Sequence, residues 1–124
     1  MMRLLALSGL VVIAACNNDS VFGRCTAPVP IAVEITLLDS VSRASVDDSA
    51  RGVAQSGTYV DSLRPAYWVA PNVLEGGRQL GIYRVTVDRP GYREWLRTDV
   101  HATRQGACGN PITVHLTALL QRSS

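Results

Sequence analysis

The fold is decided by the stretch Gly81-Ile82-Tyr83-Arg84-Val85-Thr86-Val87-Asp88. Its inward side chains, Tyr83, Val85 and Val87, occupy every second position, and this alternation predicts a β-strand that is buried on one face. Pro90-Gly91 follows and predicts a tight turn, because glycine adopts the positive φ that such a turn requires. The chain around this unit is therefore expected to be built from strands and turns.

In three further stretches, apolar side chains also recur at every second position. In residues 31–38, the apolar face is expected to consist of Ile31, Val33, Ile35 and Leu37. In residues 94–102, we expect Leu96, Val100 and Ala102 on the inward face and Trp95, Arg97, Asp99 and His101 on the outward face. The last strand is expected over residues 112–119, with His115 beside Thr113 and Thr117. Each stretch has the length and composition of a half-buried strand.

The middle of the chain is less regular. A short strand is expected within residues 46–50, and two short strands within residues 52–63, joined at Ser56-Gly57. Residues 67–69 have strand-like composition but lie between two prolines, which restricts them to an edge or short strand. Gly76-Gly77 is expected to be a turn. A helical period is absent outside the first residues, so we predict an all-β, Greek-key sandwich of seven strands, within a range of six to eight.

Length and composition bound the function. The chain has 124 residues, 47% hydrophobic and 18% charged, which is typical of one globular domain. All twelve basic residues are arginine, and they face ten acidic ones. Nucleic-acid binding needs a concentrated basic surface, so this near balance argues against nucleic acid as a partner.

The first sixteen residues predict export. Met1-Met2-Arg3 precedes an apolar run over residues 4–15, which is shorter than the roughly 20 residues that a spanning helix needs. Ile13-Ala14-Ala15-Cys16 closes the run and resembles the bacterial lipobox, in which the cysteine is acylated and the leader is removed. Ordinary secretory cleavage and a retained signal anchor are the alternatives. We therefore expect a signal peptide over residues 1–15 and a lipidated cysteine with a flexible tether over residues 16–30.

Lipidation sets the expected location and one partner. A single acyl chain gives only marginal membrane binding, whereas the two or more chains of a lipobox cysteine give stable anchoring. The resemblance thus implies a bacterial cell-envelope protein held to a membrane through acyl chains on Cys16. Asn17 follows this cysteine where an aspartate would resemble an inner-membrane retention signal. This favours the outer membrane, on its periplasmic or surface face.

Two cysteines remain for the domain itself, Cys25 and Cys108. In an oxidising compartment such a pair predicts a disulfide, and two separate thiols are the alternative. The spacing gives no support for zinc, because the chain has no Cys-x-x-Cys and only two histidines. We therefore expect neither a metal nor another cofactor.

A family resemblance adds to this interpretation. The strand ending in Leu37-Leu38-Asp39, the Gly-x-Tyr-x-Val-x-Val pattern from Gly81, and Pro90-Gly91-Tyr92 before Trp95 together resemble the transthyretin-like, carboxypeptidase regulatory-like β-sandwich. The resemblance covers about residues 30–120 and implies a domain over 31–120 with a polar tail over 121–124. It also implies that the first and last strands are parallel neighbours, with Cys25 and Cys108 preceding them at one end of the sheet.

The enzymatic branch of this family, the hydroxyisourate hydrolases, carries channel histidines and ends in Tyr-Arg-Gly-Ser. This chain ends in Gln121-Arg122-Ser123-Ser124 and has no histidine before His101, so that activity is not expected. A metal or base site is conceivable only if His101, Asp99 and His115 meet on neighbouring antiparallel strands. If the connection between these strands crosses from sheet to sheet, the cluster does not form.

The expected function is therefore non-enzymatic, with no catalytic residue assigned. We predict a lipid-anchored interaction or structural module whose partner is an envelope protein or glycan. The alternative is a carbohydrate- or peptide-binding lipoprotein that uses Trp95, on the expected outward face, together with Tyr67 and Trp68 if their stretch is exposed. The least favoured alternative is a metal-dependent envelope enzyme centred on His101 and His115.

Overall fold

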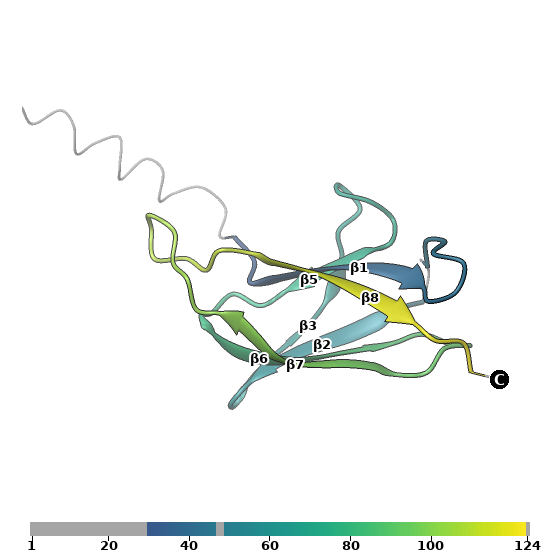
Figure 1. Ribbon diagram of the computed structural model, residues 1–124. Coiled ribbons are helices and arrows are strands. Elements are labelled where there is room, and N and C mark those ends of the chain that lie inside the picture. Colours follow the sequence, from purple (N-terminus) through teal and green to yellow (C-terminus); the bar gives the residue numbers. More distant parts are fainter. Residues whose placement is uncertain (1–29, 47–48, 124) are drawn as a thin grey trace, which may run out of the picture.

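The computed structural model describes residues 30–46 and 49–123, and this part of the chain is all-β (Figure 1). Its eight strands fall within the predicted range. They are β1 (Val33–Asp39), β2 (Arg51–Ser56), β3 (Tyr59–Ser62), β4 (Arg64–Pro65), β5 (Val73–Gly76), β6 (Gly81–Asp88), β7 (Trp95–Ala102) and β8 (Val114–Leu120). The predicted signal peptide, the tether and two of the three cysteines, Cys16 and Cys25, lie outside the described residues.

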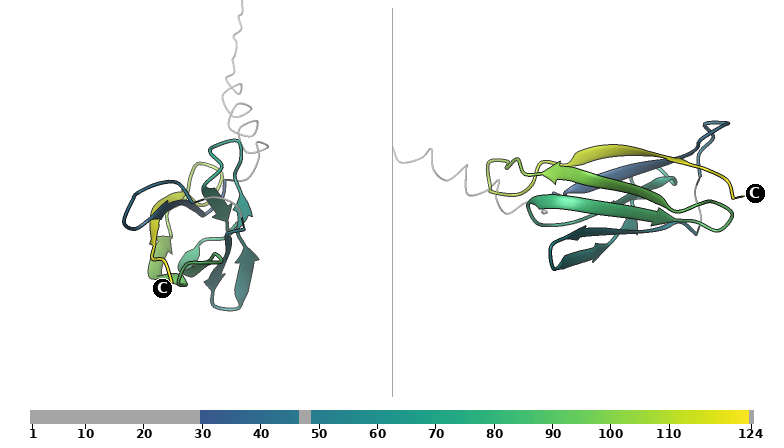
Figure 2. Two further views of the ribbon diagram at one scale, coloured as in Figure 1. Left: turned by 90° about the vertical axis from the view of Figure 1, so that its right-hand side faces the viewer. Right: turned by 60° about the horizontal axis from the view of Figure 1, so that its bottom comes forward.

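The strands form two four-stranded sheets, which lie face to face as the two layers of a sandwich (Figures 1 and 2). One sheet has the order β4-β5-β1-β8 and the other β3-β2-β6-β7. β1 and β8 are parallel, with Val33 opposite Val114 and Asp39 opposite Leu120, whereas the other strand pairs are antiparallel. The expected parallel pairing of the first and last strands is therefore confirmed.

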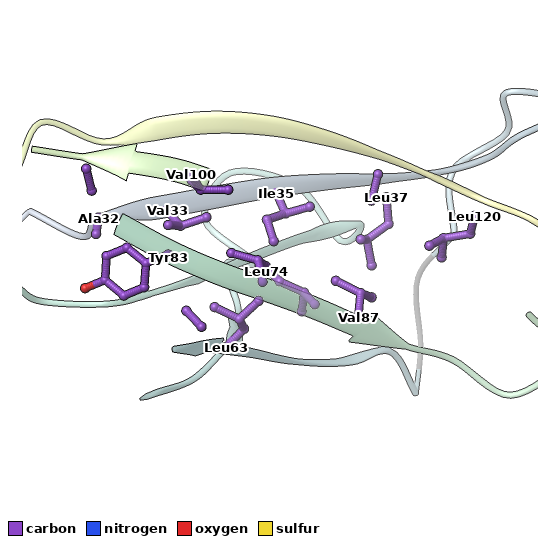
Figure 3. Packing of buried hydrophobic residues seen from close by; sticks show 14 of the residues in the cluster. Ala32, Val33, Ile35, Leu37, Leu63, Leu74, Tyr83, Val87, Val100 and Leu120 are labelled. Carbon is purple, nitrogen blue, oxygen red and sulfur yellow. The ribbon is translucent and has the colours of Figure 1, made fainter. Parts of the chain in front are cut away.

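The core lies between the sheets, where the alternating side chains of β1 and β6 meet (Figure 3). Ile35 of β1 is fully buried, as is Val85 of β6, and the burial of β1 alternates along its whole length. Tyr83 lies in this core with its hydroxyl donating to the carbonyl of Gln79 at 2.7 Å. Full burial of each such aliphatic side chain contributes about 1.5–3 kcal/mol, so these two strands organise the fold.

β7 departs from the predicted alternation because it contains a β-bulge. Tyr83 pairs with Val100 and Val85 pairs with Arg97, so two residues of β7, Thr98 and Asp99, oppose one residue of β6. Asp99 adopts a φ of 55°, in the left-handed region. Because of this extra residue, the side chains of β7 that precede the bulge point to the opposite faces from those that regular alternation predicts.

Because of the bulge, two side chains lie on the opposite faces from those predicted. Trp95 pairs with Val87 and packs against the core, although the sequence pattern predicted it on the outward face. Leu96, predicted to face inward, pairs with Thr86 on the outer face and is 45% exposed. Val100 and Ala102 lie beyond the bulge and are buried as predicted.

Other predictions about the middle of the chain are also corrected. Residues 67–69 form a turn instead of a strand, and the described residues of the range 46–50 belong to no strand. Two short strands were not predicted, β4 and β5. β5 lacks a clear alternation because both Val73 and Leu74 are buried. Gly76, predicted to form a turn with Gly77, is instead the last residue of β5, and Gly77 follows it with a φ of 83°.

Candidate functional site

The most exposed aromatic residues lie together on the turn between β4 and β5. Tyr67 is 72% exposed, Trp68 is 73% exposed and the adjacent Val69 is 50% exposed. Large apolar side chains at this exposure contribute little to the core, and aromatic residues are enriched at contacts with partners. We refer to Tyr67, Trp68 and Val69 as the aromatic turn.

The backbone around the aromatic turn is fixed by hydrogen bonds. The N–H groups of Val69 and Ala70 both donate to the carbonyl of Ala66, which is itself buried. Asn72 is buried beside β1 and makes two hydrogen bonds with Leu37. Its side-chain amide donates to the backbone carbonyl of Leu37 at 3.0 Å, and its backbone carbonyl accepts from the N–H of Leu37 at 2.9 Å. Pro65 and Pro71 flank the turn and restrict φ on both sides. The two aromatic rings are therefore presented on a preorganised loop.

Trp95, the third residue of the predicted ligand surface, has a different environment. It lies on β7, half-buried against the core, with the guanidinium of Arg97 5.4 Å from the centre of its ring. It lines a hollow of about 190 Å³ together with Arg93, Glu94, Leu96, Leu119 and Gln121. β7 and β4 are edge strands of different sheets, and Tyr67 lines a separate small cavity of about 40 Å³. The structure thus brings Tyr67 and Trp68 together but not Trp95.

The two histidines are placed on different sheets. His101 lies on β7, opposite Ile82, and His115 lies on β8, opposite Glu34. The condition for a shared site, neighbouring antiparallel strands, is therefore not met. Within residues 30–46 and 49–123, histidine, cysteine, aspartate and glutamate form no group of three that could hold a metal ion.

His115 instead belongs to a charged row on the outer face of its sheet. The pairing places Arg64, Glu75, Glu34 and His115 side by side across β4, β5, β1 and β8. His115 Nδ1 lies 3.1 Å from Glu34 Oε1. Partial burial raises the pKa of Glu75, and the neighbouring carboxylate of Glu34 raises it further. The row thus places two neighbouring carboxylates between Arg64 and His115 on the outer face of the sheet, where each contact contributes little to stability.

A buried carboxylate at the end of β1 was missed by the sequence analysis. Asp39 Oδ1 accepts the N–H groups of Val41 and Ser42, each at 2.9 Å. Its Oδ2 accepts the hydroxyl of Tyr92 at 2.9 Å and Nε of Arg122 at 2.8 Å. The side chain of Asp39 is only 3% exposed. We call Asp39, Tyr92 and Arg122 the carboxylate clasp.

The carboxylate clasp joins three segments that are distant in the sequence. It connects the end of β1, the turn between β6 and β7, and the residues after β8. The N–H of Ser42, the guanidinium of Arg122 and then the N–H of Val41 and the hydroxyl of Tyr92 hold the pKa of Asp39 well below its usual range. Backbone bonds from Arg93 to Gln121 and from Ser123 to Gly91 secure the same junction. The polar tail is thus bonded to the sandwich as far as Ser123.

The remaining predicted site residue within the described part is Cys108. It lies in the loop between β7 and β8, where the bridge between Gln105 and Pro111 closes the loop. Its predicted partner, Cys25, and the predicted lipidation site, Cys16, both lie outside the described residues. No helix within the described ranges is long and apolar enough to cross a membrane.

Comparison with known proteins finds no matching family model and no curated protein similar enough to the chain to count as a relative. The fold class follows from the sheet topology alone, which is that of an all-β sandwich of two four-stranded sheets.

Proposed function

We propose that this chain is a non-enzymatic, lipid-anchored module of the bacterial cell envelope that binds a partner through its aromatic turn. The observation that carries this proposal is the exposure of Tyr67 and Trp68 on a loop whose backbone is fixed. Rigid aromatic side chains supply large contact areas at a small cost in conformational entropy, and they dominate the energetics of many interfaces.

The proposed location depends on the first residues of the chain. The apolar run over residues 4–15 and the lipobox-like sequence ending at Cys16 support export, acylation and anchoring in the envelope, with the outer membrane favoured. The same location supports a disulfide between Cys25 and Cys108. The parallel pairing of β1 and β8 supports membership of the transthyretin-like, carboxypeptidase regulatory-like sandwiches.

The partner is proposed to be an envelope protein or glycan. Capture from the chain's own envelope tests this, with the acylated protein as bait and mass spectrometry as the readout. Wild type is compared with the double variant Tyr67→Ala/Trp68→Ala and with Val60→Ala, whose side chain is 57% exposed on β3. We expect partners that Val60→Ala retains and the double variant loses. Equal recovery by all three proteins, or recovery of nothing reproducible, contradicts the proposal.

A small-ligand function is the second candidate, because tyrosine and tryptophan also stack on sugars and peptides. Tryptophan fluorescence of the full chain, titrated with envelope oligosaccharides, separates it from the first candidate. A saturable change that Trp68→Ala removes and Trp95→Phe retains would favour a ligand-binding lipoprotein.

A further inference from the structure

The outer faces of the two sheets differ in character. One face carries the charged row across β4, β5, β1 and β8. On the other face, each strand contributes one exposed aliphatic side chain, and these are Val60 of β3, Val53 of β2, Ile82 of β6 and Leu96 of β7. The solvent-facing side of an antiparallel sheet is usually polar. The sheet of order β3-β2-β6-β7, the lower layer in Figure 1, therefore has an outer face of unusually apolar character.

This face is hollowed at the bulge of β7. The hollow has a volume of about 410 Å³, which is within the range of about 300–1,000 Å³ that is typical of small-molecule sites. It is lined by side chains from β2, β6 and β7, namely Gln55, Ile82, Arg84, Thr98 and Asp99. We call these five residues the bulge hollow.

The bulge is what brings the polar side chains of the hollow together. It places two residues of β7, Thr98 and Asp99, opposite Arg84 of β6, and Gln55 of β2 pairs with Arg84 on the other side. Asp99 has a φ of 55°. Bulges are common beside binding and active sites, where they redirect a side chain, and positive φ values of residues other than glycine also concentrate there.

The bulge hollow offers hydrogen-bond donors and acceptors at the same place. The guanidinium of Arg84 only donates, the carboxylate of Asp99 only accepts, and the amide of Gln55 and the hydroxyl of Thr98 do both. Neither Arg84 nor Asp99 belongs to an ion pair in the described part of the chain. Both charged groups are therefore available to a ligand.

The two charges select the class of ligand. An anion in the hollow would meet the carboxylate of Asp99, and a cation would meet the guanidinium of Arg84, whereas a neutral ligand meets neither repulsion. A hydroxyl group both donates and accepts, so neighbouring hydroxyls of a sugar ring match Arg84 and Asp99 together. Ile82, which is 50% exposed, adds an apolar wall against which the C–H face of such a ring can pack.

We infer that the bulge hollow binds a neutral saccharide unit. The geometry disfavours an extended peptide, because such peptides bind sheets through free backbone groups, and the hollow is centred on β6, which is paired with β2 on one side and β7 on the other. The hollow belongs to the sheet opposite the aromatic turn. The inference therefore goes beyond the proposed function and does not depend on it.

Two-dimensional amide NMR of the full chain, in a detergent without a sugar headgroup, tests the inference. The probes are maltose, cellobiose and diacetylchitobiose. We expect at least one of them to shift the amide signals of Arg84, Thr98 and Asp99 saturably, with a dissociation constant below about 10 mM. The signals of Glu34 and Glu75, on the outer face of the other sheet, should not move. Cellobiouronic acid, an anion, and deacetylated chitobiose, a cation, should bind more weakly than the corresponding neutral disaccharides.

Two variants remove one side of the hollow each. Arg84→Ala removes the donors, and Asp99→Gly removes the carboxylate while it permits the positive φ of the bulge. We expect each variant to raise the dissociation constant at least about fivefold, because a bound hydroxyl loses a charged partner. Arg51→Ala is the matched control, since it removes an arginine from the same sheet face, opposite Asp88 and outside the hollow. It should bind like wild type.

The amide map of the wild-type chain keeps the test independent of the variants. No saturable shift with any of the three disaccharides up to about 100 mM, or tighter binding of a charged form, overturns the inference. Blocked trialanine that shifts the same amides more strongly than the disaccharides would assign the hollow to peptides instead. Shifts at Tyr67 and Trp68 in place of Arg84 and Asp99 would move the saccharide to the aromatic turn. Loss of saccharide binding at the hollow would leave the capture of partners by the aromatic turn unaffected.

Discussion

Tyr92 donates its hydroxyl hydrogen to Asp39 Oδ2 at 2.9 Å and thereby joins the two sheets at one end of the sandwich. Asp39 ends β1 in one sheet, and Tyr92 belongs to the turn that follows β6 in the other. The carboxylate that accepts this bond is almost fully buried, so it is expected to matter for the stability of the domain.

Replacement of Asp39 by asparagine should destabilise the domain. The variant keeps one acceptor for the N–H groups of Val41 and Ser42, but it places an amide donor against Nε of Arg122. A buried donor that faces another donor is left without a partner. We expect the thermal midpoint to fall by on the order of 5 °C or more, measured by circular dichroism. Asp88→Asn, at an exposed carboxylate, is the control and should change the midpoint little.

The carboxylate clasp should also make stability depend on pH. The pKa of Asp39 is lowered in the folded state, so its contribution is fully present above the unfolded pKa of about 3.9 and is lost as the pH falls further toward the folded value. Urea unfolding between pH 7 and pH 3 measures this. The difference in unfolding free energy between wild type and Asp39→Asn should be constant near neutral pH and shrink below about pH 4. A difference that grows on acidification would show that the pKa of Asp39 is not lowered.

The bulge in β7 predicts the relative cost of two neighbouring truncations. Trp95 packs against the core, whereas Leu96 is 45% exposed on the outer face. Trp95→Ala should therefore lower the free energy of unfolding by about 2–4 kcal/mol and Leu96→Ala by less than about 1 kcal/mol. Uninterrupted alternation along residues 94–102 predicts the opposite order. Chemical denaturation of the two variants decides between these assignments.

Asp99 is the residue that makes the bulge, and its conformation is open to a direct test. At a φ of 55°, glycine is accommodated without strain, whereas a β-branched side chain is disfavoured by about 1–2 kcal/mol. We expect Asp99→Gly to be as stable as wild type or slightly more stable, and Asp99→Val to be less stable by that amount. Thr98→Val is the control at the adjacent residue, which carries no positive φ. Equal stability of Asp99→Val and Thr98→Val would place the bulge elsewhere.

The alternating strands were the part of the fold that could be predicted from the sequence. β6 has the predicted bounds, and the turn at Gly91 has the predicted positive φ, 87°. Both follow from local chemistry, because a period of two and a Pro-Gly pair need no distant partner. The bulge could not be foreseen in this way, since nothing about Thr98-Asp99 in the sequence distinguishes a bulged pair from a regular one.

The features that depend on distant contacts were not predicted. Asp39 meets Tyr92 and Arg122 across 53 and 83 residues of sequence, so no local pattern indicated their meeting. The aromatic turn was assigned to a strand because Tyr67, Trp68 and Val69 are good strand formers. Its conformation is instead set by the flanking prolines and by the contact of Asn72 with β1. The interpretation of Tyr67 and Trp68 as a binding surface nevertheless depended on both side chains being exposed.

The claim on which the proposed role depends is that the mature chain begins with an acylated Cys16. The intact mass of the protein, purified from its native membrane without reduction, measures this directly. We predict a chain that starts at residue 16, carries the added mass of two or more acyl chains, and lacks two hydrogen atoms because Cys25 and Cys108 are joined. A native protein that still begins with Met1 and carries no lipid would contradict the anchor, the compartment and the envelope role together.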